Sequence, residues 1–98
     1  MNTPVWRLKG LTGSEAGHLE LRDGRLLYTP TEPGKPGFDA PLADVQDVHF
    51  PWHYFGGGFK ARIGGEEIRF SFIEPHNDQA DVRSGRASGK EWRKLLKA

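Results

Sequence analysis

The segment GHLELRDGRLLYTP, residues 17–30, constrains the fold more than any other part of the chain. At its centre lies Asp23-Gly24, a pair that favours a two-residue type I′ turn because both central residues of that turn take positive φ. A hairpin folded there has one apolar face, formed by Leu19, Leu21, Leu26 and Tyr28. The turn chemistry and the alternation of apolar and polar residues agree, so the sequence predicts this hairpin and its register.

A second hairpin is predicted around Gly64-Gly65, which separates FKARI from EEIRFSF. Alternation again predicts an apolar face, formed by Phe59, Ala61, Ile63, Ile68, Phe70 and Phe72. The opposite, polar face carries Lys60, Arg62, Glu67, Arg69 and Ser71. We expect Glu67 to lie beside Arg62 and to offset its charge.

The other segments are shorter or less regular. Residues 5–11 (VWRLKGL) alternate and predict a strand, whereas residues 12–17 (TGSEAG) and 29–37 (TPTEPGKPG) have the composition of loops. Residues 38–50 predict an extended piece, a turn over 41–44, and a strand through Val45, Val48 and Phe50. The polar segment EPHNDQADVRSGR, residues 74–86, predicts irregular structure.

A short amphipathic helix is predicted over residues 88–97. Ser88 and Glu91 have the spacing of a capping box, and Trp92, Leu95 and Leu96 recur at helical spacing on one side. A helix of about ten residues is unstable alone. We therefore expect Trp92 to pack against the rest of the protein.

Composition indicates one β-rich domain over residues 1–98, with 13 glycines and 7 prolines suited to turns. The absence of cysteine excludes disulfides and thiolate metal sites, and a net charge of +1 gives no overall attraction to nucleic acid or anionic membranes. The sequence contains no apolar run long enough to span a bilayer and no signal-peptide profile, so we expect a cytoplasmic protein.

Several amphipathic antiparallel strands and one terminal helix must bury their apolar faces together. The simplest arrangement is a curved sheet or partly open β-barrel, with Trp92 and its leucines closing one opening. The sequence therefore predicts a mainly β fold with one C-terminal helix.

The ordered segments GHLELRDGRLLYTP, FDAPLADVQDVHF, FKARIGGEEIRFSF and EWRKLL resemble the pleckstrin-homology-like superfamily, nearest its GRAM-type and small bacterial branches. The resemblance covers about residues 17–97 and rests on the order of the motifs, since each motif alone is weak. It implies a barrel of seven strands capped by a C-terminal helix. It also implies a binding or scaffolding role without catalysis.

Phosphoinositide-binding members of that superfamily carry a Lys followed by Lys/Arg-x-Arg across the first two strands. Lys9 and Arg22 match the ends of this pattern, but its middle position is Glu20, and the intervening segment adds Glu15. This departure weighs against binding of inositol phosphates.

The aromatic segment PWHYFGGGF, residues 51–59, has two interpretations. Its glycines fit neither a P-loop nor a dinucleotide-binding pattern, so we assign them to a bend between strands. Alternation places Trp52 and Tyr54 with Val48 and Phe50 on one face, which favours the core. Because Pro51 disfavours a regular central strand, the alternative is a projecting loop that binds a partner through Trp52, His53, Tyr54 and Phe55.

We find no pattern for catalysis or metal binding. His49 and His53 have the spacing of a helical metal pair, but Pro51 lies between them and the segment is predicted to be extended. No serine lies in a nucleophile motif. We therefore expect no enzyme activity, no cofactor, no metal, no nucleic acid and no small-molecule substrate.

Two function classes are argued from the residues, beside a third option, an accessory subunit of an enzyme encoded elsewhere. The first is a module that binds a protein partner or itself, through the aromatic loop or an uncovered sheet edge. The second is a peripheral membrane module whose anionic-ligand residues would be Lys9, Arg22, Lys60, Arg62 and Arg69. The basic residues between 83 and 97 favour a solvated surface, with contact to an acidic partner, anionic lipid or nucleic acid as the alternative.

Overall fold

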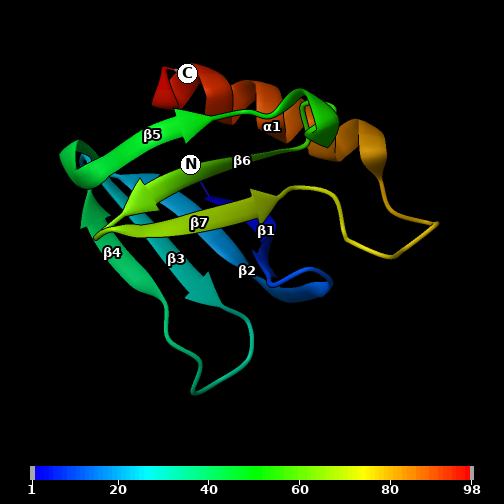
Figure 1. Cartoon of the computed structure of the whole chain (residues 1–98), viewed down its shortest axis with the longest axis horizontal. Coiled ribbons are helices and arrows are strands. Elements are labelled where there is room, and N and C mark those ends of the chain that lie inside the picture. The colour runs from blue at the N-terminus through cyan, green and yellow to red at the C-terminus, as the bar shows by residue number, and fades with distance from the viewer. Residues whose placement is uncertain (1, 98) are drawn as a thin grey trace.

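The computed structural model describes residues 2–97, which form one antiparallel sheet and one α-helix (Figure 1). The strands are β1 (Asn2–Lys9), β2 (Gly13–Arg22), β3 (Arg25–Pro30), β4 (Phe38–Pro41), β5 (Val45–His49), β6 (Gly58–Ile63) and β7 (Glu66–Ser71). Two 3₁₀ turns, η1 (Leu42–Asp44) and η2 (Trp52–Tyr54), flank β5, and the helix is α1 (Val82–Leu96). The predicted mainly β fold with one C-terminal helix is confirmed.

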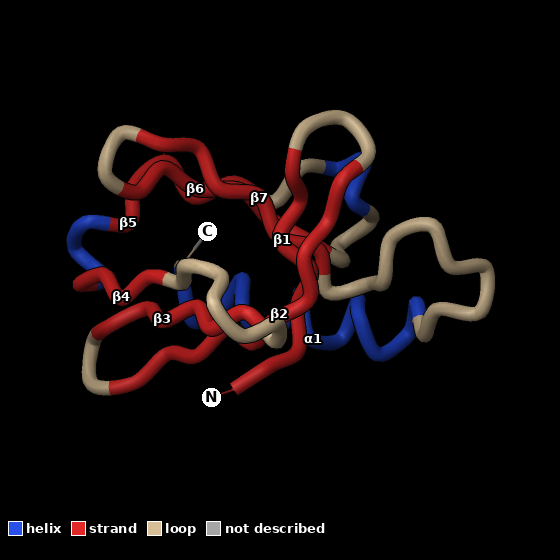
Figure 2. Tube along the Cα trace, turned by 90° about the horizontal axis from the view of Figure 1, so that it is seen from below, coloured by secondary structure: helices blue, strands red, loops and turns tan. Residues whose placement is uncertain are grey.

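The strand order is β4-β3-β2-β1-β7-β6-β5, so β4 and β5 are the two edges of the seven-stranded sheet. The sheet curls until the two edge strands, joined through η1, lie on the same side of the molecule (Figure 2). No pairing joins the two edges in the described part of the chain. The structure is thus an open, curled sheet and not a closed barrel.

Both predicted hairpins are confirmed, the first with its predicted register and the second with its predicted faces. In the first, Leu19 pairs with Tyr28, and Asp23 and Gly24 take φ values of 53° and 73°. In the second, Ile63 pairs with Glu66, and the two turn glycines again have positive φ. These values are those that a type I′ turn requires.

The loop prediction for residues 12–17 is wrong from Gly13 onward, because β2 begins there. Residues 13–20 of β2 pair with β1, from Lys9↔Gly13 to Asn2↔Glu20. Pairing with a neighbouring strand therefore overrides a composition that favours a loop.

The predicted strand through Val45 and Val48 contains a β-bulge. The register between β5 and β6 shifts between Gln46 and His49, and Asp47 takes a φ of 53°. The extra residue turns both valines toward the core cluster, against which they pack.

The helix is longer than predicted and begins six residues earlier. The Asp81 side chain accepts a hydrogen bond from the Ser84 backbone N–H at 2.9 Å, which caps the helix before Val82. Ser88 therefore lies within the helix and does not cap it. The buried residues of α1 are Gly85, Gly89 and Trp92, whereas Leu95 is exposed, so its predicted place on the apolar side is also wrong.

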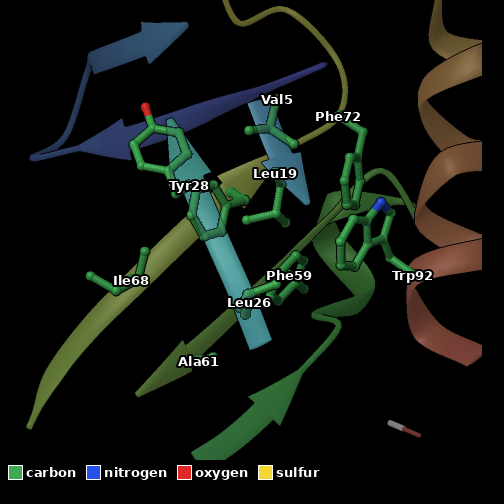
Figure 3. Close-up of a cluster of buried hydrophobic side chains, with 10 residues drawn as sticks. Val5, Leu19, Leu26, Tyr28, Phe59, Ala61, Ile68, Phe72 and Trp92 are labelled. Atoms are coloured by element: carbon green, nitrogen blue, oxygen red, sulfur yellow. The ribbon is translucent and has the colours of Figure 1, made fainter. Parts of the chain in front are cut away.

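Trp92 packs into the core as predicted. Its side chain is fully buried and its ring stacks on Phe72, with ring centroids 6.4 Å apart (Figure 3). The indole Nε1–H donates a hydrogen bond of 2.9 Å to Thr3 Oγ1, so its polar atom is satisfied inside the core. The helix is thereby anchored to β1 and to the end of β7.

An aromatic cluster fills the interior of the curled sheet. Phe59 and Phe70 have centroids 5.5 Å apart, and Tyr28 lies 5.3 Å from Phe70. The other buried members of the cluster are Val5, Leu19, Leu26, Ala61, Ile68, Phe72 and Trp92. The apolar faces of both predicted hairpins therefore meet in one core.

Candidate functional site: an aromatic and basic groove

The candidate site begins with the turn that follows β5. Pro51 has φ −60° and caps η2, where the backbone N–H of Tyr54 donates to Pro51 O at 3.0 Å. The N–H of Phe55 donates to Trp52 O, and Phe55 then takes the left-handed conformation with φ 53°. This tight turn reverses the chain into β6 and carries the aromatic residues outward.

The alternation that placed Trp52 in the core fails at this turn. Trp52 is 84% exposed and Phe55 is 67% exposed, whereas Phe50 stacks on Phe59 in the core with centroids 5.2 Å apart. A 3₁₀ turn has about three residues per repeat, so the period of two ends at Pro51. The alternative interpretation, in which aromatic residues project from a loop, describes Trp52 and Phe55.

A glycine contact joins this turn to the helix. A Cβ atom added at Gly89 would fall on the carbonyl oxygen of Gly56, so only glycine permits this approach of the two backbones. One turn earlier, a Cβ atom added at Gly85 would overlap the Ile73 side chain and approach the carbonyl oxygen of Phe72. The position of the turn against α1 is thus set by backbone packing.

Above this contact, the turn and the helix enclose a groove of about 660 Å³. One wall is aromatic and apolar, and it consists of Phe50, Pro51, Trp52 and Phe55. The other wall is provided by α1 and consists of Val82, Arg83, Arg86, Ala87, Lys90 and Arg93. The volume lies in the range of protein sites for small ligands or a few side chains.

The groove is strongly basic. Four of its lining residues are Arg or Lys and none is Asp or Glu, although the whole chain has a net charge of only +1. Arg86 and Lys90 form no ion pair with any of residues 2–97, and the Arg93 guanidinium lies 6.0 Å from the centre of the Phe50 ring. The groove lining thus contains four cationic side chains and no carboxylate.

The four cations form a stripe because of where the helix begins. Residues 83, 86, 90 and 93 recur at spacings of three and four, and therefore lie along one side of α1. A helix that began at residue 88 would leave the first two outside it. The Asp81-x-x-Ser84 cap is the sequence signal that could have placed all four on one stripe.

His53 and Tyr54, also predicted to bind a partner, do not line the groove. His53 is exposed and lies edge-on between its two neighbours, with centroids 5.7 Å from Trp52 and 4.9 Å from Tyr54. Tyr54 is half-buried, and its ring lies against Gly58. The histidine instead supports the Trp52 side chain from the side.

The five predicted anionic-ligand residues do not converge on one site. Lys9 lies beside Gly13, the first residue of β2, whereas Arg22 is the last residue of β2. The 10 residues of β2 span about 30 Å, so the two cations lie at opposite ends of this strand. Each of these two cations has an acidic neighbour, Glu15 at 3.0 Å and Glu20 at 3.8 Å.

Among the other three, Lys60 and Arg69 are direct partners across β6 and β7, and the Arg69 guanidinium donates to Gly10 O at 2.7 Å. Arg62 pairs with Glu67 in register, as predicted, but its ion pair is with Asp47 at 3.6 Å. Only Lys60 and Arg69 therefore form a local cationic pair on the outer face of the sheet.

Glu15 lies at the centre of a polar cluster in which Lys9 is one of the hydrogen-bond donors. The Tyr28 hydroxyl donates to Glu15 Oε1 at 2.8 Å, and Lys9 Nζ donates to Oε2 at 3.0 Å. Burial raises the pKa of Tyr28 and the bond to Glu15 raises it further. Burial alone would raise the pKa of Glu15, but the hydrogen bonds from Tyr28 and Lys9 hold it below its ordinary value.

The groove thus offers apolar contact and positive charge. Residues 2–97 contain no group of three or more His, Cys, Asp or Glu side chains that could hold a metal ion, and none of their helices is long and apolar enough to cross a membrane. No protein-family model, curated protein or solved structure matches the chain. The function is therefore argued from the groove itself.

Proposed function

We propose that the protein is a non-enzymatic binding module of pleckstrin-homology-like type, and that the groove between η2 and α1 binds a protein partner. The observation that carries this proposal is the exposure of Trp52 and Phe55 on the wall of a groove lined by arginines. Tryptophan and arginine are enriched among the residues that dominate binding energy at protein interfaces.

The backbone at Phe55 adds support. A residue with a Cβ atom in the left-handed conformation costs roughly 1–2 kcal/mol, and the neighbouring Gly56 takes the same region without that cost. Strain of this kind is often retained where a side chain has a functional role. The strained residue here presents an exposed aromatic ring to the groove.

The pleckstrin-homology-like assignment is supported by the order of motifs in the sequence and by the coarse architecture. The resemblance implies seven antiparallel strands and a C-terminal helix, which are present, and a barrel, whereas the observed sheet is open. A fold does not define a ligand, so the function is argued from the groove residues.

Selection from a random peptide library tests the proposal. Peptides selected on the wild-type protein should bind the double variant Trp52→Ser/Phe55→Ser at least tenfold more weakly, because both aromatic contacts are lost. Leu11→Ser is the matched control, since Leu11 is fully exposed in the β1–β2 turn and does not line the groove. Peptides that bind all three proteins equally would contradict the proposal.

Binding to anionic lipid is the second candidate, since exposed aromatic residues beside cations also suit a membrane interface. It ranks lower because Lys9, Arg22 and Arg62 each pair with a carboxylate and do not converge with Lys60 and Arg69. Co-sedimentation with neutral and anionic vesicles at low and high salt separates the two candidates. Light scattering on the same sample detects self-association through the groove.

A further inference from the structure

We propose that the occupant of the groove is an acidic peptide segment in extended conformation, in which Asp or Glu alternates with large apolar residues. This inference rests on the proposed function and specifies the chemistry of the partner. It follows from three properties of the groove: its charge, the separation of its two walls, and its length.

Charge complementarity determines the sign of the partner. The helical wall carries Arg83, Arg86, Lys90 and Arg93 with no acidic residue among the groove lining. Some cations elsewhere on the molecule have acidic neighbours, such as Arg25 with Asp39 at 2.7 Å and Lys94 with Glu91 at 3.9 Å. A partner with carboxylates at this wall would neutralise the charges of Arg86 and Lys90, which form no ion pair with any of residues 2–97.

The separation of the walls determines the pattern within the partner. Cations line the helical side, and Phe50, Trp52 and Phe55 line the opposite side. In an extended chain, successive side chains point to opposite sides. A peptide lying along the groove would therefore direct every second residue toward the cations and the residues between them toward the aromatic rings.

The length of the cationic stripe determines the size of the segment. From Arg83 to Arg93 the helix rises about 15 Å. An extended chain covers that distance in about five residues. Two or three carboxylates and two apolar side chains thus match the stripe and the aromatic wall.

The concave shape favours a peptide over a membrane. The aromatic rings and the cations stand on facing walls above the contact between Gly56 and Gly89. A planar lipid surface meets both kinds of residue best when they project side by side from a convex surface. An extended peptide, by contrast, contacts both walls at once.

The test uses a labelled synthetic peptide in which glutamate alternates with leucine and phenylalanine over eight residues. Two control peptides replace every glutamate by glutamine or every apolar residue by alanine. We expect both controls to bind at least tenfold more weakly in fluorescence anisotropy. We also expect binding of the acidic peptide to weaken between 0.05 and 0.5 M salt, because the Debye length shortens from about 14 Å to about 4 Å.

Charge reversal on the protein supplies a matched pair of variants. Lys90→Glu places an acid in the groove and should weaken binding of the acidic peptide at least tenfold. Lys94→Glu makes the same change of charge on the same helix outside the groove lining, and should have less than a threefold effect. A peptide with lysine in place of glutamate should bind the double variant Arg86→Glu/Lys90→Glu better than it binds the wild type.

Three outcomes would overturn the inference. Equal binding of the glutamate and glutamine peptides would show that charge has no role. Equal effects of Lys90→Glu and Lys94→Glu would place the acidic peptide elsewhere. Tighter binding of anionic vesicles or of an oligothymidine strand, lost in Lys90→Glu, would assign the groove to a phosphate-bearing ligand.

The inference can fail while the proposed function holds. Library peptides that depend on Trp52 and Phe55 but contain no acidic residues would overturn the inference alone. If no peptide depends on the two aromatic residues, the proposed function fails as well.

Discussion

In the two β-hairpins each turn residue adopts the backbone conformation that its own chemistry favours. At the joint between η2 and α1, where Gly56 contacts Gly89, the chain departs from local preference. Asp23-Gly24 and Gly64-Gly65 take positive φ where a type I′ turn requires it. At the joint, an aromatic residue takes positive φ, and two glycines lie inside a helix that they destabilise by roughly 1 kcal/mol each relative to alanine.

The two regions differ in how far local and tertiary preferences agree. The hairpins form the core, and local and tertiary preferences agree there, as expected for a sheet that must fold reliably. At the joint, residues in locally unfavourable conformations place the aromatic turn against the helix, and Trp52 and Phe55 are left exposed. Such departures are expected at functional sites.

The largest effect is expected from removing the anchor of the helix. Trp92→Ala should lower the free energy of unfolding by about 3–5 kcal/mol, because it empties a fully buried site and leaves Thr3 without its hydrogen-bond partner. Urea denaturation followed by circular dichroism measures this loss. A loss below about 1 kcal/mol would mean that the helix does not close the core.

The next variant tests the glycine joint directly. In an exposed helix Gly→Ala stabilises by about 1 kcal/mol, but Gly89→Ala should destabilise by about 1–3 kcal/mol because its Cβ would overlap Gly56 O. Ser88→Ala, the preceding helical residue, is the control and should change stability by less than about 0.5 kcal/mol. If Gly89→Ala were stabilising instead, the turn would not rest on the helix backbone.

A substitution in the first turn tests the hairpin side of the comparison. Gly24→Val should cost about 1–2 kcal/mol, because a β-branched residue is strained at a φ of 73°. Thr29→Val, at an exposed position of β3, should be tolerated since strands favour valine. Thermal denaturation of the two variants provides the comparison, and equal stability would indicate a different turn.

The smallest effect concerns pH and lies outside both regions. The folded protein holds the pKa of Glu15 below its ordinary value of 4.5, so the carboxylate contributes stability above that pH and loses it as the pH falls below. Glu15→Gln should remove this component of the acid dependence, at a cost near neutral pH of about 1 kcal/mol or less. Urea denaturation of both proteins at several pH values between 3 and 7 measures this component. The same pH dependence of the free energy of unfolding in both proteins would argue against the cluster around Glu15.

The sequence was sufficient for the hairpins, because the dipeptides at their turns and the alternation around them carry the same information. It was insufficient where long-range pairing decides. Residues 13–17 join β2 because β1 lies beside them, which their own composition does not indicate. The bulge at Asp47 likewise becomes evident only when β6 is paired with β5.

For the candidate site, the sequence pointed to the aromatic residues and to the basic residues separately. It did not predict that the two groups line one groove. The predicted helix started at Ser88 and therefore excluded Arg83 and Arg86 from the stripe. The contact between Gly56 and Gly89 joins residues far apart in the chain, and helix propensity alone argues against glycine there. The groove is thus a tertiary feature that local patterns do not contain.

The most direct test of the central claim is a nuclear magnetic resonance titration of the ¹⁵N-labelled protein with a peptide selected on it. The account predicts that the backbone amide shifts cluster at residues 50–56 and 82–93, on the two walls of the groove, and that they vanish in Trp52→Ser/Phe55→Ser. Shifts confined to the edge strands β4 and β5, or to the outer face around Lys60 and Arg69, would contradict it.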